Sequence, residues 1–83
     1  MADVRISVRA RDELDALDPP APERIRSKLL DEVAERPDRH LVRLSGRNDY
    51  RVRIGDYRVI VDWDKSESVL RVTKVEKRDT VYD

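Results

Sequence analysis

The sequence contains no cysteine and no phenylalanine, one histidine and only two glycines among its 83 residues. Without cysteine, the chain can form neither a disulfide framework nor a thiolate metal site. The single histidine, His40, cannot build a zinc centre with others of its kind. A domain of this size also buries too small a core to enclose a large cofactor. We therefore expect no metal and no cofactor.

Long apolar segments are also missing from the sequence. It has no run of 18 apolar residues, and its first residues lack the charged and then apolar pattern of a secretion signal. We therefore expect no membrane association and a cytoplasmic location. The length predicts a single domain covering residues 1–83, built around one small hydrophobic core.

Charged side chains are abundant but balanced. They make up 43% of the residues, and the 18 basic and 18 acidic side chains give a formal net charge of zero. This balance argues against indiscriminate binding to nucleic acids. The charges are unevenly spread, however, because the segment 43–58 contains five arginines and only two aspartates. We expect this segment to form the basic surface of the protein.

The first half of the chain predicts one strand and two helices. Residues 3–8 alternate between polar and apolar side chains, which is typical of a half-buried strand. Two segments with helical spacing follow; Pro19-Pro20 separates them, Pro22 suits the start of the second, and Pro37 ends it. Their apolar stripes are Ala10, Leu14 and Leu17 in the first segment and Ile25, Leu29, Leu30 and Val33 in the second.

The second half predicts strands joined by tight turns, over residues 41–44, 50–54, 57–63 and 69–75. Gly55-Asp56 suits a two-residue hairpin turn, because glycine readily adopts the positive φ that such turns require. The last strand does not keep one period, so we expect a bulge near Thr73. The predicted fold is α+β, with an N-terminal helical hairpin on one face of a small, mainly antiparallel sheet in the order β-α-α-β-β-β.

Alternation in the 50–58 hairpin predicts a row of arginines on the exposed face of the sheet. If the apolar side chains face the helices, Arg51 and Arg53 project from the other face about 7 Å apart. Arg58 then lies across the turn from them. Guanidinium groups bind phosphate bidentately, so such a patch suits a nucleic-acid backbone. The alternative is a solvated outer face with no ligand, and spacing alone does not choose between the two.

The C-terminal residues add two cations and an aromatic ring. Lys77 and Arg78 lie close in sequence to Tyr82, whose ring suits stacking on a nucleobase. The alternative is that Tyr82 only covers the edge of the sheet. Tyr57 and Trp63 alternate with the buried side of their strand, and we assign both to the core.

Several of these segments resemble the RelE/ParE superfamily of toxin proteins. The segment 50–60, YRVRIGDYRVI, is similar to the central hairpin of that family. Leu44-Ser45-Gly46 resembles the turn before the hairpin, and the run KRDTVY at 77–82 resembles the family's His-Arg-x-x-Val-Tyr ending. The predicted order of elements is also the family's order, so the resemblance extends over nearly the whole chain.

This resemblance implies a toxin of a type II toxin–antitoxin pair, with a RelB-like antitoxin as its partner. In the RelE branch, which we favour, it implies an endoribonuclease that binds the ribosome, cleaves mRNA in the A site and so inhibits translation. The implied chemistry is a metal-independent attack of a ribose 2′-OH on the adjacent phosphate. The alternatives are a ParE-like inhibitor of DNA gyrase on the same fold, and a catalytically weak member that mainly binds its antitoxin.

The resemblance also assigns roles to individual residues by position. The implied catalytic residues are Arg58, Arg78 and Tyr82, and the implied RNA-binding residues are Arg51, Arg53 and Lys77. The two catalytic arginines would stabilise negative charge on the phosphoryl oxygens, while the tyrosine would stack on or orient the nucleotide. Arginine does not deprotonate in proteins, so these residues include no evident general base.

Overall fold

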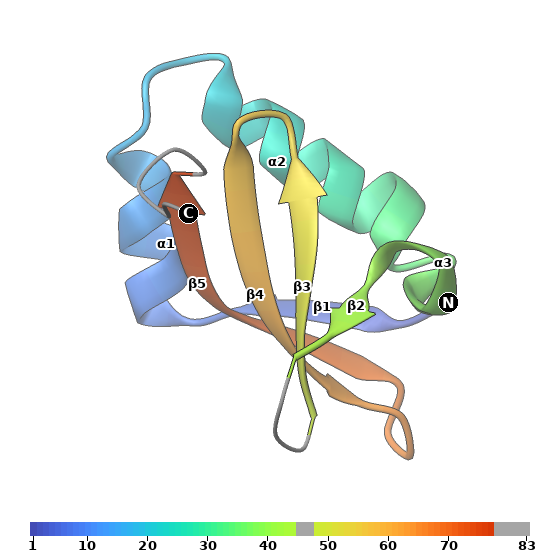
Figure 1. Cartoon of the computed structure of the whole chain (residues 1–83). Coiled ribbons are helices and arrows are strands. Elements are labelled where there is room, and N and C mark those ends of the chain that lie inside the picture. The colour runs from blue at the N-terminus through green and yellow to red at the C-terminus, as the bar shows by residue number, and fades with distance from the viewer. Residues whose placement is uncertain (45–47, 78–83) are drawn as a thin grey trace.

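The computed structural model describes residues 1–44 and 48–77 of the chain. It contains one five-stranded sheet, with the helical segments packed against one of its faces (Figure 1). The helical elements are α1 (Val8–Asp15), α2 (Ala21–Lys28), a π-helical turn η1 (Leu29–Val33) that continues α2, and α3 (Pro37–His40). The strands are β1 (Asp3–Ile6), β2 (Val42–Arg43), β3 (Asp49–Ile54), β4 (Tyr57–Asp64) and β5 (Val69–Lys77).

The strands lie side by side in the order β1-β5-β4-β3-β2. β1 runs parallel to β5, and the other neighbouring pairs are antiparallel. Antiparallel neighbours can be joined by tight turns, whereas a parallel pair needs a longer crossover, which here contains the helices. The predicted α+β class and the helical hairpin on one face are confirmed, and the β1–β5 pair is the one parallel element of the sheet.

The hairpin between β3 and β4 has the predicted two-residue turn. Gly55 has a φ of 59°, in the left-handed region that glycine adopts without steric cost. Ile54 pairs with Tyr57 across this turn, and Arg53 therefore lies directly opposite Arg58. The turn thus determines which side chains of the two strands become neighbours.

The predicted bulge near Thr73 is confirmed by the pairing of β4 with β5. Ile60 pairs with Lys74, but the next residue, Val61, pairs with Val72, so Thr73 is the extra residue. Its hydroxyl donates a hydrogen bond to the carbonyl oxygen of Ile60 at 3.3 Å. Because a bulge changes the alternation of side chains, Val72 and Val75 both face the core.

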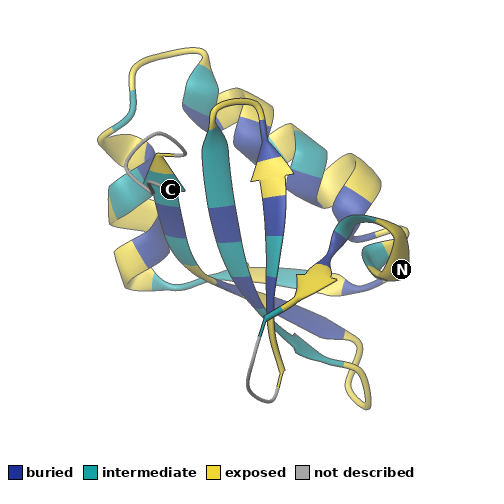
Figure 2. Ribbon diagram, in the orientation of Figure 1, coloured by how far each residue is buried: buried dark blue, intermediate teal, exposed yellow. Residues whose placement is uncertain are grey.

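The hydrophobic core lies between the helices and the sheet (Figure 2). α1 begins at Ser7, whose Oγ accepts a hydrogen bond from the amide of Ala10 at 3.0 Å. Tyr57 and Trp63, predicted to belong to the core, pack against it and are partly exposed. The largest fully buried side chains are Leu14, Ile25, Leu29, Val33, Val59, Val61, Leu70 and Val72. Among the described residues no polar side chain is buried, so the fold depends on apolar burial.

Three details of the helical half differ from the sequence prediction. Val8 does not continue the first strand but is the first residue of α1, where it is exposed. Leu30 is 53% exposed, because the wider π-helical turn places Leu29 and Val33 on the core side and Leu30 outside. Pro37 does not simply end a helix, since it also starts α3, where its missing N–H costs no hydrogen bond.

Within the described segments, no helix is long and apolar enough to cross a membrane.

The π-helical turn predicts opposite effects at two adjacent leucines. Leu29 is 1% exposed and Leu30 is 53% exposed. We expect Leu29→Ala to lower the free energy of unfolding by about 2–5 kcal/mol, because it leaves a cavity in the core. We expect Leu30→Ala to change it by about 0.5 kcal/mol or less. Urea titrations of both variants measure this difference, and equal losses would contradict the described helix phase.

Candidate functional site

The face of the sheet opposite the helices carries the basic side chains of the hairpin. Residues paired across neighbouring strands point to the same face, with their Cβ atoms about 4.5–5.5 Å apart. One row across β3, β4 and β5 consists of Arg53, Arg58 and Glu76. The row beside it consists of Arg51, Ile60 and Lys74. We call the four basic residues of these rows, together with Glu76, the cationic face.

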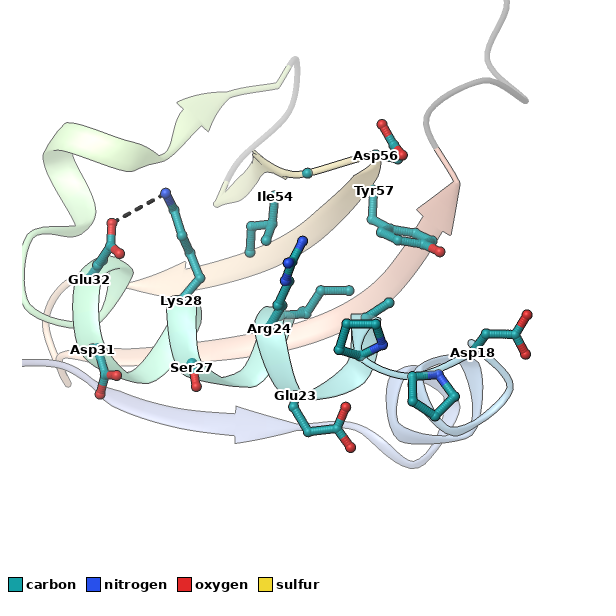
Figure 3. Close-up of a pocket in the computed structure, with 15 residues that line it drawn as sticks. Asp18, Glu23, Arg24, Ser27, Lys28, Asp31, Glu32, Ile54, Asp56 and Tyr57 are labelled. Atoms are coloured by element: carbon teal, nitrogen blue, oxygen red, sulfur yellow. Dashed lines mark ion pairs between the residues drawn. The ribbon is translucent and has the colours of Figure 1, made fainter.

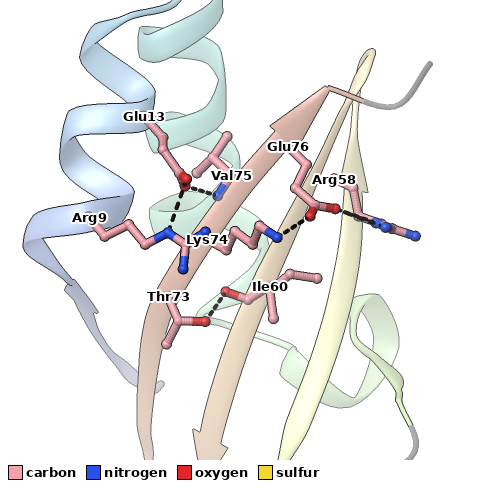
Figure 4. A network of polar contacts seen from close by, with 8 residues as sticks. All are labelled: Arg9, Glu13, Arg58, Ile60, Thr73, Lys74, Val75 and Glu76. Atoms are coloured by element: carbon pink, nitrogen blue, oxygen red, sulfur yellow. Dashed lines mark hydrogen bonds and ion pairs between the residues drawn. The ribbon is translucent and has the colours of Figure 1, made fainter. Parts of the chain in front are cut away.

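A carboxylate joins two of the cations on this face (Figure 4). Oε1 of Glu76 accepts hydrogen bonds from Nη2 of Arg58 at 2.8 Å and from Nε at 3.2 Å. Oε2 of Glu76 lies 2.7 Å from Nζ of Lys74. All three side chains are partly buried, and that of Glu76 is 21% exposed. The contacts therefore hold Arg58 and Lys74 on either side of one negative charge.

The two cations also change the titration of Glu76. The hydrogen bond from Lys74, followed by that from Arg58, holds the pKa of the Glu76 carboxyl below its ordinary value. Burial acts in the opposite direction but is the smaller effect. Glu76 is therefore a carboxylate at neutral pH and accepts both hydrogen bonds in its charged form.

The structure brings together three of the six residues that the sequence resemblance selected. Arg53 lies directly across from Arg58, and Arg51 lies in the adjacent row of the same face. Lys77 is exposed at the end of β5, but it pairs with Tyr57 and so lies on the helix side of the sheet, not on the cationic face. The other two, Arg78 and Tyr82, lie outside the described residues. Their roles remain predictions from the resemblance.

Sequence reasoning missed Glu76 as a member of this site. Its position relative to Arg58 depends on the bulge at Thr73, which moves residue 76 onto the same face as residue 58. A bulge near Thr73 was predicted, but the sequence did not specify which residues of β4 and β5 are paired. The alternation after the bulge, with Val75 facing the core, was the signal available for placing Glu76 outside.

Helix α1 anchors the part of β5 that supplies Glu76. β1 pairs with β5 only as far as Val72, so within residues 1–44 and 48–77 the edge of β5 beside α1 has no strand neighbour at Val75. Glu13 from α1 takes that place, and its Oε1 accepts a hydrogen bond from the Val75 amide at 2.7 Å. Nε of Arg9 donates to Oε2 of Glu13 at 3.2 Å (Figure 4). The N–H group of Val75, the residue before Glu76, thus has a hydrogen-bond acceptor on helix α1 in place of one on a neighbouring strand.

The comparison with known proteins agrees with this arrangement of elements. The family model for the ParE toxin of the type II toxin–antitoxin system parDE matches residues 4–82. The chain belongs to this family. The predicted membership of the RelE/ParE superfamily is thus confirmed. No match was found among curated protein sequences.

Solved toxin structures resemble this ParE-family chain over almost its whole length. The RelBE2 toxin–antitoxin complex of Mycobacterium tuberculosis matches with a TM-score of 0.83 and 22% identity, over 93% of this chain and 98% of that chain. The intact Escherichia coli RelBE complex matches with a TM-score of 0.75 and 24% identity, over 93% of this chain and 96% of that chain. The archaeal RelE–RelB complex of Pyrococcus horikoshii matches with a TM-score of 0.71 and 27% identity, over 96% of this chain and 98% of that chain. Because the M. tuberculosis and E. coli structures are less than 25% identical to this chain, they show only that it shares their fold.

A groove elsewhere on this ParE-family toxin has the opposite charge. A groove of about 690 Å³ lies between α2, the loop before it and the tip of the β3–β4 hairpin (Figure 3). Its charged lining consists of Asp18, Glu23, Asp31, Glu32 and Asp56, with Arg24 and Lys28 as the cations. Lys28 is paired with Glu32 at 3.2 Å. The excess of acids makes this groove unsuitable for a phosphodiester backbone, which leaves the cationic face as the candidate nucleic-acid interface.

Candidate metal ligands do not cluster in the described part of this ParE-family toxin. No group of three or more histidine, aspartate or glutamate side chains in residues 1–44 and 48–77 is arranged to hold a metal ion. The charged groups of the cationic face are three guanidinium groups, one ammonium group and a single carboxylate. Such a set suits the binding of phosphate oxygens and the stabilisation of negative charge.

The lowered pKa of Glu76 predicts a pH-dependent contribution to stability. A carboxyl whose pKa falls on folding stabilises the folded state above its unfolded pKa, and this contribution disappears as the pH falls through the folded-state pKa. We expect the toxin to be more stable than its Glu76→Gln variant at neutral pH. The difference in the free energy of unfolding should shrink below about pH 4.5.

Urea titrations of both proteins between about pH 7 and pH 3 measure this difference. The other carboxyls are common to the two proteins, so the difference isolates Glu76. A difference that does not change with pH would contradict the ion-pair account of Glu76.

Proposed function

We propose that this protein is a ribosome-dependent endoribonuclease that cleaves mRNA in the A site and so inhibits translation. The observation that carries the proposal is the row in which Arg53 lies directly opposite Arg58, with Arg51 in the adjacent row. These side chains share the open face of the sheet, and their guanidinium groups stay charged at any physiological pH. The resemblance of the sequence to the RelE branch supports the choice of RNA as the target, and the solved RelE structures share the fold that this choice needs.

The proposed reaction needs no metal. The ribose 2′-hydroxyl gives up its proton to water as its oxygen attacks the adjacent phosphorus. The bond from phosphorus to the 5′-oxygen of the next nucleotide breaks and that oxygen takes up a proton, so the products are a 2′,3′-cyclic phosphate and a 5′-hydroxyl. Negative charge that develops on the non-bridging oxygens would be stabilised by Arg58 and by Arg78 from the C-terminal residues. Arg51 and Arg53 would hold the RNA backbone on the cationic face, Lys77 would contact it from the end of β5, and Tyr82 would stack on or orient the nucleotide.

Proton removal from the 2′-OH is the step for which the proposed site is least equipped. The cationic face contains no histidine, and arginine does not act as a base in proteins. The carboxylate of Glu76 is engaged by Arg58 and Lys74, and its lowered pKa makes it a weak base. Alignment of the 2′-OH with the phosphate on the ribosome would supply the larger effect, since correct positioning alone accelerates such reactions strongly.

We also propose that the protein acts in the cytoplasm and is controlled by a RelB-like antitoxin. The family model describes toxins of two-protein systems, and the similar structures from three organisms are complexes of a toxin with its antitoxin. A small domain with one open, charged sheet face offers a large surface that a partner segment can cover.

The antitoxin proposal predicts a reversible growth defect. We expect expression of the toxin alone to stop growth, and co-expression of the antitoxin from the same locus to restore it. Copurification of the two chains and a rise in the melting temperature of the toxin measure the binding directly. Growth arrest that persists although the two chains copurify would contradict inhibition by this partner.

The alternative function is inhibition of DNA gyrase. The observation that favours it is the family model, which describes the ParE toxin of the parDE system. The zero net charge also gives the whole chain little long-range attraction to RNA. Both functions would use the same fold, so only a functional assay distinguishes them.

Primer extension on a defined message, translated in a purified ribosome system, tests the proposed function. We expect cleavage inside the A-site codon with the wild-type protein. We expect Arg58→Ala to slow it by about 100- to 1000-fold, the usual cost of removing one group that stabilises transition-state charge. Arg71→Ala is the matched control, because Arg71 is an exposed arginine of the same sheet, opposite Asp62 rather than Arg58.

Two outcomes would contradict the nuclease proposal. An intact message with normal translation would exclude it, and a gyrase supercoiling assay would then test the alternative. Growth arrest and antitoxin binding that are both unaffected by Arg58→Ala would instead indicate a protein that only binds partners. Circular dichroism of each variant checks that the fold is retained.

A further inference from the structure

Glu76 is the one acid among the five residues that define the cationic face, and its position relative to two of the cations is well defined. It lies directly opposite Arg58 on the neighbouring strand, and Lys74 lies two residues earlier on its own strand. The other acids that the pairing places on this side of the sheet belong to rows farther from Arg58; they are Asp3, Asp49, Asp62 and Asp64. Figure 4 shows the Glu76 carboxylate between the ends of the Arg58 and Lys74 side chains.

The contact with Glu76 uses one particular edge of the Arg58 guanidinium. Nε and Nη2 form the side edge, and both donate to Oε1 of Glu76, at 3.2 and 2.8 Å. The guanidinium has five N–H donors in a rigid plane, so three remain, two on Nη1 and one on Nη2. One N–H of Nη1 and the remaining N–H of Nη2 form the end edge, which has the fork geometry that matches two oxygens of a phosphate, while the other N–H of Nη1 points toward the Cδ side.

We propose that Glu76 is a positioning residue of the RNA-cleaving site, which holds the guanidinium of Arg58 by its side edge so that its end edge is directed to the scissile phosphate. This inference rests on the proposed function. Two hydrogen bonds to one carboxylate fix the plane of the guanidinium. The strand pairing and the contact between Glu13 and Val75 fix the backbone beneath Glu76.

The charge of Glu76 has a second, opposite effect on substrate binding. A carboxylate among four cations lowers the positive potential of the face and so weakens its attraction for the RNA backbone. Removal of that charge should therefore strengthen RNA binding while it releases Arg58 from its fixed orientation. A role in positioning predicts a lower kcat without a higher KM, a combination that a general loss of folding does not produce.

The test compares Glu76→Gln and Glu76→Ala with wild type in ribosome-dependent cleavage. Asp62→Asn is the matched control, since it removes one negative charge from the same side of the sheet, away from Arg58. We expect kcat to fall by about 10- to 100-fold in Glu76→Ala, and less in Glu76→Gln, with KM unchanged or lower in both. We expect Asp62→Asn to keep the wild-type kcat.

A measurement on the protein alone gives a second readout. In nitrogen-15 NMR spectra, the Nε–H group of Arg58 should exchange slowly with water in wild type and in Asp62→Asn, and fast in Glu76→Ala. An Arg58 signal that is the same in Glu76→Ala as in wild type would show that the carboxylate does not hold the guanidinium, and would overturn the inference.

The kinetic outcomes separate this inference from the proposed function. Wild-type kcat in both Glu76 variants would overturn the positioning role while the nuclease proposal stands. A higher KM with an unchanged kcat would also overturn it, because Glu76 would then act in binding only. Absence of cleavage by the wild-type protein would overturn both, and that result is recognised because Asp62→Asn is then inactive as well.

Discussion

The register of the three central strands is the constraint on which the candidate site depends. On the outer face it aligns Arg53, Arg58 and Glu76, and the adjacent row on the inner face consists of Val52, Val59 and Val75. A slip by one residue would exchange the two faces, moving charges into the core and valines into water. Packing of the valines against the helices therefore stabilises the arrangement of the charges.

Two local features determine this register. The Gly55-Asp56 turn sets the pairing of β3 with β4, because only one pairing is compatible with a two-residue turn at that place. The extra residue Thr73 then shifts β5 by one position relative to β4, between the pair at Ile60 and the pair at Val61. The bulge brings Glu76 to the outer face and keeps Val72 and Val75 in the core. The same extra residue therefore determines both the charged row on the outer face and the packing of β5 against the helices.

Local patterning makes a basic surface possible on a chain without net charge. The segment 43–58 carries the excess of arginines, whereas acids dominate the groove beside α2. An anionic ligand would therefore be attracted to one face of the sheet and repelled from the groove, although the molecule as a whole is neutral. This separation of charge links the sequence pattern to a direction of approach for the ligand.

Much of this architecture was predictable from the sequence because it follows from short-range rules. Alternation identified the strands, and the glycine turn identified the hairpin that opposes Arg53 and Arg58. The exposed Leu30 was not predictable, because periodicity assumes a regular α-helix and the π-helical turn at Leu29–Val33 departs from it. The contact between Arg58 and Glu76 joins residues 18 positions apart and needs the exact pairing of β4 with β5, which periodicity does not supply.

The most direct test of the account is a structure of the toxin on a ribosome programmed with an mRNA whose A-site riboses carry 2′-O-methyl groups. This modification removes the attacking hydroxyl and preserves the uncleaved substrate. The account predicts the scissile phosphate on the cationic face, within hydrogen-bond distance of the end edge of Arg58, with Glu76 still bound to Nε. A phosphate that lies away from Arg58, or a toxin that does not bind the ribosome, would contradict it.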